Sequence, residues 1–253
     1  MKVTATAPAA ASWRLPPETL ALEPDEVHVW RAALDQPLSR VENLLLTLAA
    51  DERIRAERFY FRRDREHFIV ARGVLRAILG RYLNSAPGQL SFCYSPFGKP
   101  ALAEDVGGAM LHFNVSHSHG LALYAVTRGK EVGIDLERIR PDLAIEQIAE
   151  RFFSGREVAT LRALPKNTRT VAFFLCWTRK EAYIKARGEG LSLPLDQFDV
   201  SLIPGKPATL LRAEGAPHEA SRWSLHDVAP IPSYTAALAV EGRAWRLACW
   251  QWQ

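Results

Sequence analysis

Residues 25–83 change from an alternating to a helical pattern of apolar positions. Val27 and Val29 alternate with polar neighbours, which predicts a short strand. Apolar residues then recur every three or four positions over 41–50 and again over 51–83, where the second stretch has a break near 62–64. One strand followed by helices is therefore expected.

The middle of the chain has the pattern of strands joined by turns. Apolar residues alternating with polar ones predict strands over 90–94, 110–115, 121–127 and 131–137. The segment 128–130, Arg-Gly-Lys, separates the last two strands and is suited to a hairpin turn.

The same order of elements then repeats. Helical spacing predicts helices over 144–153, 156–164 and 170–187, and Gly188 suits the C-terminus of the last one. Strand patterns return over 198–202, 222–228, 234–240 and 245–252. Because strand, helices and strands occur twice, we expect an α+β fold built from two halves that meet near residue 128.

The predicted organisation has three parts. Residues 1–24 are rich in Ala, Pro and Thr without a period, so we expect a loosely held N-terminal extension. An N-terminal α+β half over 25–128 and a C-terminal α+β half over 129–253 follow.

Composition excludes several classes of protein. The 253 residues are 48% hydrophobic and 24% charged, which is ordinary for a globular chain and unlike disordered, collagen-like or coiled-coil sequences. No apolar run approaches the ~18 residues of a membrane span, so no membrane partner is expected. The three cysteines show no paired or metal-type spacing and the N-terminus has no signal-peptide core, which predicts a cytoplasmic protein with reduced thiols.

The positive charge is concentrated in one segment. Residues 51–83 carry nine arginines against five acidic residues, whereas the rest of the chain holds 23 basic and 23 acidic residues. Such a local field suggests an anion site more than the broad basic surface of a nucleic-acid-binding protein. Two alternatives stay open, a solvated amphipathic helix and a nucleic-acid-binding module that uses this helix.

An acidic strand and a charged helix are candidates for chemistry. Asp135 and Glu137 alternate with apolar residues, so both carboxylates project from one face of the strand and could hold Mg²⁺, or could simply form its outer face. Glu181 and Lys185 stand four residues apart on one helical face. They could complete the metal site and bind phosphate, or form a surface ion pair worth ~0.3–0.5 kcal/mol.

A segment over 112–120, expected as a turn between strands, holds three of the seven histidines. A phosphate could bind the hydroxyl of Ser116, the imidazole of His117 and the N–H groups of such a turn. Zinc bound by His112, His117 and His119 is a second interpretation, and a structural turn is a third.

Four motifs in a fixed order point to one family. They are Gly98-Lys99, Ser116-His117, Gly133-Ile134-Asp135-x-Glu137 and Trp177-x-x-Lys180-Glu181-x-x-x-Lys185. Together they resemble the Sfp-type 4′-phosphopantetheinyl transferases, and the resemblance runs from about residue 51 to 202.

The resemblance implies an activity and a fold. Members of the family, which are of the holo-[acyl-carrier-protein] synthase type, move the 4′-phosphopantetheine arm of coenzyme A onto a serine of an apo acyl or peptidyl carrier protein. Adenosine 3′,5′-bisphosphate is released. The implied fold is a monomeric pseudo-dimer of two α+β halves with coenzyme A in the cleft between them, and nucleic acid is not an expected partner. The sequence does not indicate which carrier or pathway is served.

The resemblance also implies roles for individual residues. Asp135, Glu137 and Glu181 would hold Mg²⁺ on the coenzyme A pyrophosphate, Glu181 would act as general base for the carrier serine, and Lys185 would pair with a phosphate oxygen. The further implied coenzyme A contacts are Ser116 and His117 at the 3′-phosphate, Lys99 at another phosphate, and Arg55 and Arg72. On this interpretation the positive segment over 51–83 faces a polyanionic substrate.

Overall fold

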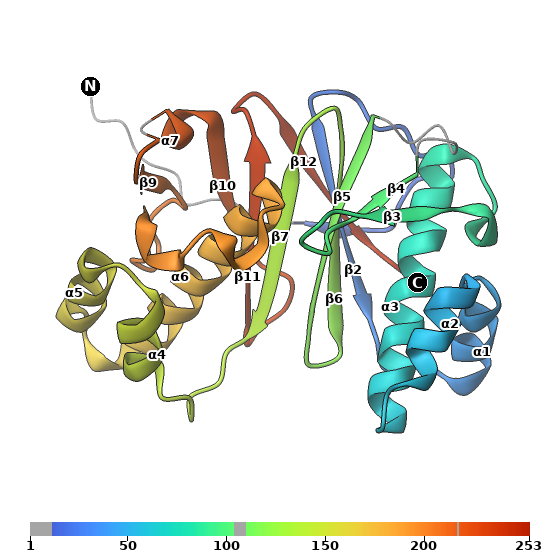
Figure 1. Cartoon of the computed structure of the whole chain (residues 1–253), viewed down its shortest axis with the longest axis horizontal. Helices are drawn as coiled ribbons and strands as arrows, with labels where there is room; N and C mark the ends of the chain where they lie inside the picture. Colours follow the sequence, from blue (N-terminus) through green and yellow to red (C-terminus); the bar gives the residue numbers. More distant parts are fainter. Residues whose placement is uncertain (1–11, 104–109, 217) are drawn as a thin grey trace.

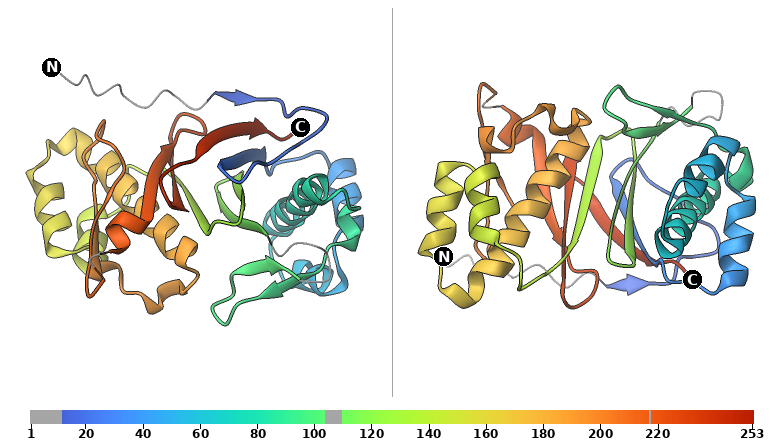
Figure 2. Two further views of the ribbon diagram at one scale, coloured as in Figure 1. Left: turned by 90° about the horizontal axis from the view of Figure 1, so that it is seen from above. Right: turned by 60° about the horizontal axis from the view of Figure 1, so that its bottom comes forward.

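Two β-sheets face each other, and each carries a long helix on its outer side (Figure 1). The computed structural model describes residues 12–103, 110–216 and 218–253, so residues 1–11 of the predicted extension lie outside the described residues. Helix α3 (Arg62–Leu83) covers one sheet and α6 (Lys166–Arg187) covers the other, and Figure 2 shows them on opposite outer faces. The expected α+β architecture of two similar halves is confirmed.

The strands of the two sheets come from both ends of the chain. The first sheet has the order β1 (Trp13–Arg14), β12 (Arg246–Gln251), β2 (Glu26–Ala33), β6 (Leu121–Arg128) and β5 (Leu111–Ser118). The second has the order β10 (Trp223–Val228), β11 (Tyr234–Glu241) and β7 (Val132–Arg138). The last strand, β12, therefore returns from the predicted C-terminal half to pair with β2 of the first half.

Alternating side chains give three apolar layers. Trp30 and Leu75 belong to the core under α3, and Phe173 and Tyr183 belong to the core under α6. A third core lies between the sheets and includes Val29, Leu123, Ile134 and Leu238. Strand β6 is buried along nearly its whole length, as expected for a strand with apolar layers on both faces.

The remaining helices and short strands agree with the sequence pattern in part. The helical pattern over 51–83 is interrupted at 58–61, slightly before the expected break, and Gly188 ends α6 as predicted. The strands predicted over 90–94 and 198–202 are present in shorter form, whereas the short elements at 100–102, 210–213 and 219–222 were not predicted. The other elements are α1 (Leu38–Leu46), α2 (Ala50–Glu57), β3 (Phe92–Tyr94), β4 (Pro100–Leu102), α4 (Ile145–Phe152), α5 (Gly155–Ala163), β8 (Phe198–Val200), β9 (Leu210–Ala213) and α7 (Glu219–Arg222).

The predicted hairpin at 128–130 is wrong. Strand β6 pairs with β2 and β5, whereas β7 pairs with β11 in the other sheet. The hairpin joins β5 to β6 instead, where His119 and Gly120 both have positive φ, as a two-residue hairpin turn requires. Ser116 and His117 consequently lie on a strand and not in a turn.

Strands β5 and β7 are joined by hydrogen bonds from the backbone of β7 to side chains of β5, and not by backbone–backbone hydrogen bonds. The N–H groups of Ile134, Leu136 and Arg138 donate to side chains of β5 at 2.9, 3.1 and 3.3 Å. The acceptors are Asn114 Oδ1, Ser116 Oγ and Ser118 Oγ. These contacts satisfy the edge of β7 and hold the two halves in register.

The described part of the extension is held in place, contrary to expectation. Strand β1 pairs with β12, and Trp13 Nε1 donates to the Ala229 carbonyl at 2.9 Å. Leu22 is buried in the core under α3. Apolar residues in a stretch without periodicity supply these anchors. Among the described residues, no helix is long and apolar enough to cross a bilayer.

Candidate active site

Helix α6 crosses β7 at unusually short range. A Cβ atom on Gly133 would lie 2.1 Å from the Ala182 carbonyl oxygen and 2.3 Å from the Ala186 nitrogen, so only glycine fits there. This close approach places Glu181 and Lys185 of α6 beside Asp135 of β7. The Gly-x-Asp spacing of the sequence therefore has a direct structural reason.

Asp135 is the centre of the cluster. Its side chain is buried, and Oδ1 accepts hydrogen bonds from Lys185 Nζ at 2.6 Å and from Ser116 Oγ at 3.0 Å. The Ser116 hydroxyl also lies 3.1 Å from Lys185 Nζ. The other carboxylate oxygen, Oδ2, is buried and has no hydrogen-bond partner among the described residues. An unpartnered buried carboxylate oxygen is costly unless a cation or a proton meets it.

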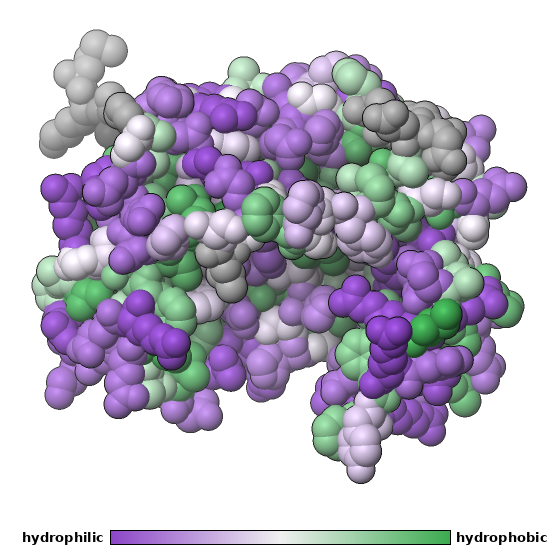
Figure 3. Space-filling view, in the orientation of Figure 1, coloured by the Kyte–Doolittle hydropathy of each residue, from purple (hydrophilic) through white to green (hydrophobic). Residues whose placement is uncertain are grey.

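The cluster opens into a cleft between the halves, where the space-filling view shows the surface indented (Figure 3). Six of the predicted site residues line this cleft of about 530 Å³, together with apolar side chains from α4 and α6. Its lining is Val115, Ser116, His117, Asp135, Glu137, Phe152, Trp177, Glu181, Lys185 and Leu195.

The charges in this cleft repel one another. Burial and the neighbouring Asp135 charge raise the pKa of Glu137, and burial with the charges of Asp135 and Glu137 raises the pKa of Glu181. Lys185 opposes both shifts but is the only ammonium among the residues lining this cleft. Three carboxylates against one ammonium favour a further cation.

The donor set suits a hard divalent cation. Carboxylate oxygens are the ligands that Mg²⁺ prefers, and Asp135 Oδ2 is an oxygen still to be satisfied. In the arrangement seen, the described residues contain no three His, Cys, Asp or Glu side chains close enough to form a finished metal site. Glu137 of β7 and Glu181 of α6 line the same cleft as Asp135, so the chemistry of the donor set fits Mg²⁺.

The histidines do not support the zinc interpretation. His112 and His117 are five positions apart on β5 and so project from opposite faces. His112 Nδ1 lies 3.1 Å from Glu131 Oε1, away from the cleft. Desolvation and the Lys185 charge lower the pKa of His117, which favours the neutral form of its ring.

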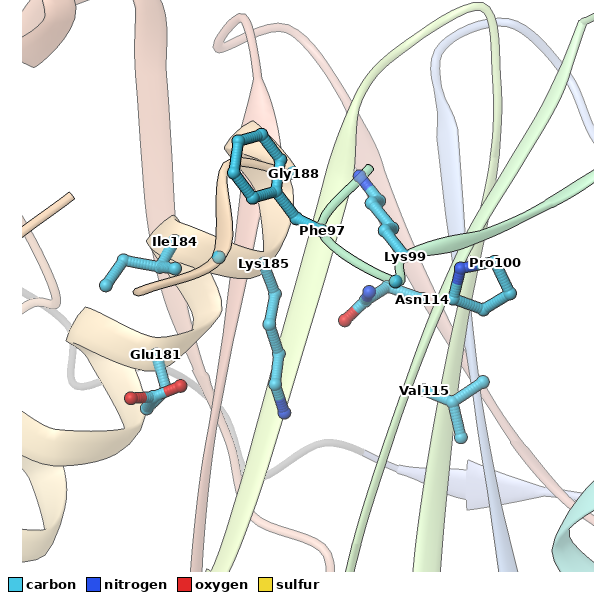
Figure 4. A pocket seen from close by; sticks show the side chains of 11 residues that line it. Phe97, Lys99, Pro100, Asn114, Val115, Glu181, Ile184, Lys185 and Gly188 are labelled. Carbon is cyan, nitrogen blue, oxygen red and sulfur yellow. The ribbon is translucent and has the colours of Figure 1, made fainter. Parts of the chain in front are cut away.

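A second pocket, of about 300 Å³, adjoins the cleft between α6, β5 and the loop joining β3 to β4 (Figure 4). It shares Glu181 and Lys185 with the cleft, and Phe97, Asn114 and Ile184 contribute to its walls. The stem of Lys99 lines it, but its ammonium donates to Glu131 Oε2 at 2.9 Å instead of facing the cleft.

Arg55 and Arg72 line neither pocket. The Arg72 guanidinium donates to Glu52 and to the Tyr94 hydroxyl and lies over the Phe92 ring. Arg55 lies over the Phe68 ring, beside a separate hollow next to α2. The roles of both arginines toward coenzyme A stay predictions.

Most arginines of the positive segment over 51–83 bind other groups of this chain. At least six of its nine arginines donate hydrogen bonds to carboxylates or carbonyls of this chain, and Arg76 is fully buried against Glu52. The expectation that the whole surplus faces a polyanionic substrate, or a nucleic acid, gains no support from this arrangement.

Three residues at the site were not singled out by the sequence pattern. Asn114 and Ser118 hold β7, and Ser118 also donates to Glu137 at 3.1 Å, while Glu131 holds Lys99. The polar residues at 114, 116 and 118 alternate along one face of β5. This alternation of polar residues on a buried strand could have identified Asn114 and Ser118 from the sequence.

Comparison with known proteins assigns the family. The model of the 4′-phosphopantetheinyl transferase superfamily matches residues 131–239, and that of the 4′-phosphopantetheinyl transferase N-terminal domain matches residues 22–128. The 4′-phosphopantetheinyl transferase HetI of Nostoc sp. (strain PCC 7120) is 44% identical over 241 residues, which covers 95% of this chain and 98% of that relative. The chain belongs to the Sfp-type 4′-phosphopantetheinyl transferases.

A second relative shares less of its length. The 4′-phosphopantetheinyl transferase Sfp of Bacillus subtilis is 35% identical over 171 residues, covering 67% of this chain and 74% of that relative. The family resemblance drawn from the four motifs is thus confirmed, and the two family-model matches fall on the two sides of the cleft.

Proposed function

We propose that this transferase moves the 4′-phosphopantetheine arm of coenzyme A to a serine of an apo acyl or peptidyl carrier protein in an Mg²⁺-dependent reaction. The observation that carries the proposal is the cluster of Asp135, Glu137, Glu181 and Lys185, in which Asp135 Oδ2 is buried without a partner among the described residues. A pyrophosphate with its cation complements such a cluster in charge.

Each group has a chemical task in this proposal. Asp135, Glu137 and Glu181 would hold Mg²⁺. When bound, this ion would neutralise negative charge on the pyrophosphate. Lys185 binds a phosphate oxygen, and Glu181 accepts the serine proton, directly or through water. The serine oxygen bonds to the phosphorus that bears the pantetheine arm while the bond to the departing adenosine 3′,5′-bisphosphate breaks. Ser116 and His117 bind the 3′-phosphate.

The test is intact-protein mass spectrometry of an apo carrier protein incubated with this protein, coenzyme A and Mg²⁺, with and without EDTA. We expect a gain of one phosphopantetheine that EDTA abolishes. Carriers from fatty-acid, polyketide and nonribosomal-peptide synthesis are tried in parallel. If no carrier gains a phosphopantetheine and the protein does not bind coenzyme A, the proposal is rejected. The alternative of nucleic-acid binding by the arginine-rich segment over 51–83 would then be tested.

Mg²⁺ alone is expected to raise the melting temperature. Burial and the Asp135 charge raise the pKa values of Glu137 and Glu181, so the charged forms of these carboxylates repel one another. A bound cation removes that repulsion and stabilises the fold by mass action. As the pH falls toward the raised pKa values of Glu137 and Glu181, these carboxylates bind protons in place of the cation. The increase in melting temperature caused by Mg²⁺ therefore becomes smaller.

Thermal unfolding at several pH values, with Mg²⁺ or EDTA, measures the increment. Asp135→Asn serves as the comparison variant, and it should lose most of the Mg²⁺ effect. An equal increment in this variant would place the cation elsewhere.

A further inference from the structure

The loop between β3 and β4 reaches from the first half across to the end of α6. Ser95 makes its shape rigid, because its hydroxyl accepts the N–H groups of Phe97 and Lys99 and its own N–H donates to the Lys99 carbonyl. The loop packs closely on the segment after α6, where a Cβ atom on Gly190 would lie 3.3 Å from Phe97 Cβ. This loop forms one wall of the smaller pocket (Figure 4).

One side chain ties this loop to the second half. Lys99 Nζ donates to Glu131 Oε2 at 2.9 Å and to the Ala186 carbonyl at 3.1 Å. Glu131 immediately precedes β7, the strand of Asp135, and Ala186 follows Lys185 on α6. The ammonium therefore joins three segments that carry or enclose the active site.

Glu131 is itself fixed on its second oxygen. His112 Nδ1, near the start of β5, lies 3.1 Å from Oε1, and the Glu131 carbonyl accepts the N–H of Glu241. Hydrogen bonds from His112 and Lys99 lower the pKa of Glu131 to about 2, so the carboxylate stays charged over the working range of pH. A carboxylate clamped in this way determines where the Lys99 ammonium lies.

We propose that Glu131 is a positioning residue, which acts through Lys99 to hold the β3–β4 loop closed against α6 and so shapes the smaller pocket as part of the coenzyme A site. The coenzyme part of this inference rests on the proposed function. The alternative is that Lys99 binds a phosphate directly. In that case Glu131 would compete with the phosphate for the Lys99 ammonium. The two mechanisms predict opposite effects of neutralising Glu131.

The experiment compares Glu131→Gln, Lys99→Met and the double variant with the unaltered protein. If Lys99 acts through Glu131, both single variants should raise the KM for coenzyme A by about two- to fivefold, the range of a partly exposed ion pair. The kcat and the KM for the carrier should change little, because neither residue touches the reacting atoms. The double variant should be no worse than either single variant, as expected for one shared interaction.

Glu241→Gln is the matched control. This variant also replaces a glutamate by glutamine, and Glu241 is exposed to a similar extent as Glu131. Its carboxylate pairs with Arg222 and not with Lys99. It should leave the KM for coenzyme A unchanged. A lower or unchanged KM in Glu131→Gln, with a raised KM in Lys99→Met, would overturn the proposal in favour of direct phosphate binding by Lys99.

A second measurement does not depend on transferase activity. Hydrogen–deuterium exchange of the 92–102 segment in the ligand-free protein should be faster in Glu131→Gln and Lys99→Met, and unchanged in Glu241→Gln. Faster exchange without any transfer by the unaltered protein would reject the proposed function but retain the closure. Unchanged exchange in both site variants would reject the closure itself.

Discussion

Replacing Glu181 by glutamine is expected to lower the rate of phosphopantetheine transfer by ~10²–10⁴-fold, the range for loss of a general base. Glutamine keeps the shape of the side chain but accepts no proton and is a poor ligand for a cation. The measurement is the single-turnover rate of carrier modification at saturating coenzyme A and Mg²⁺.

The same variant should keep its fold or even gain stability. Burial and the charges of Asp135 and Glu137 raise the pKa of Glu181, so its charged form is less favourable in the folded than in the unfolded protein. A neutral amide removes that repulsion, and the melting temperature should not fall. The control is Glu146→Gln, an exposed partner of Arg169 on the same half, which should leave the rate unchanged. Near-normal transfer by the Glu181 variant would exclude Glu181 as base and as metal ligand.

The neighbourhood of the candidate site residues could be predicted in part from the sequence, because spacing places each pair on one face, whereas their roles came from the family resemblance and stay predictions. Asp135 and Glu137 share a strand face, and Glu181 and Lys185 share a helix face, so each pair is brought together by local geometry alone. The structure then adds the contact between the pairs. That contact depends on Gly133, a residue whose importance becomes evident only when α6 is seen against β7.

Features that depend on long-range pairing were harder to predict. The 128–130 turn has hairpin composition, yet β6 and β7 separate into different sheets because their partners β2 and β11 come from distant parts of the chain. The arginines of 51–83 were expected to face a substrate. Several of their carboxylate and carbonyl partners, such as Glu52 and the Leu90 carbonyl for Arg76, lie on other elements and cannot be identified from charge alone.

Replacing Gly133 by alanine is expected to be the most destabilising single change in the active-site region. The new Cβ would meet the Ala182 carbonyl oxygen at 2.1 Å and the Ala186 nitrogen at 2.3 Å, and both are backbone atoms that no rotamer change can move away. Helix α6 must therefore shift from β7 as a unit. We expect a loss of ~3 kcal/mol in the free energy of unfolding, at the upper end for overpacking.

The same shift should impair transfer beyond its effect on stability. Displacing Glu181 and Lys185 by about 1 Å from Asp135 should cost on the order of 10²-fold in rate for the protein that remains folded. Denaturant unfolding and transfer rates at low temperature separate the two effects. Gly155→Ala is the matched control, because a Cβ there meets nothing within 4 Å at the first position of α5, and it should be neutral or slightly stabilising. If Gly133→Ala were as stable as Gly155→Ala, the close contact of α6 with β7 would not be what holds the two pairs of site residues together.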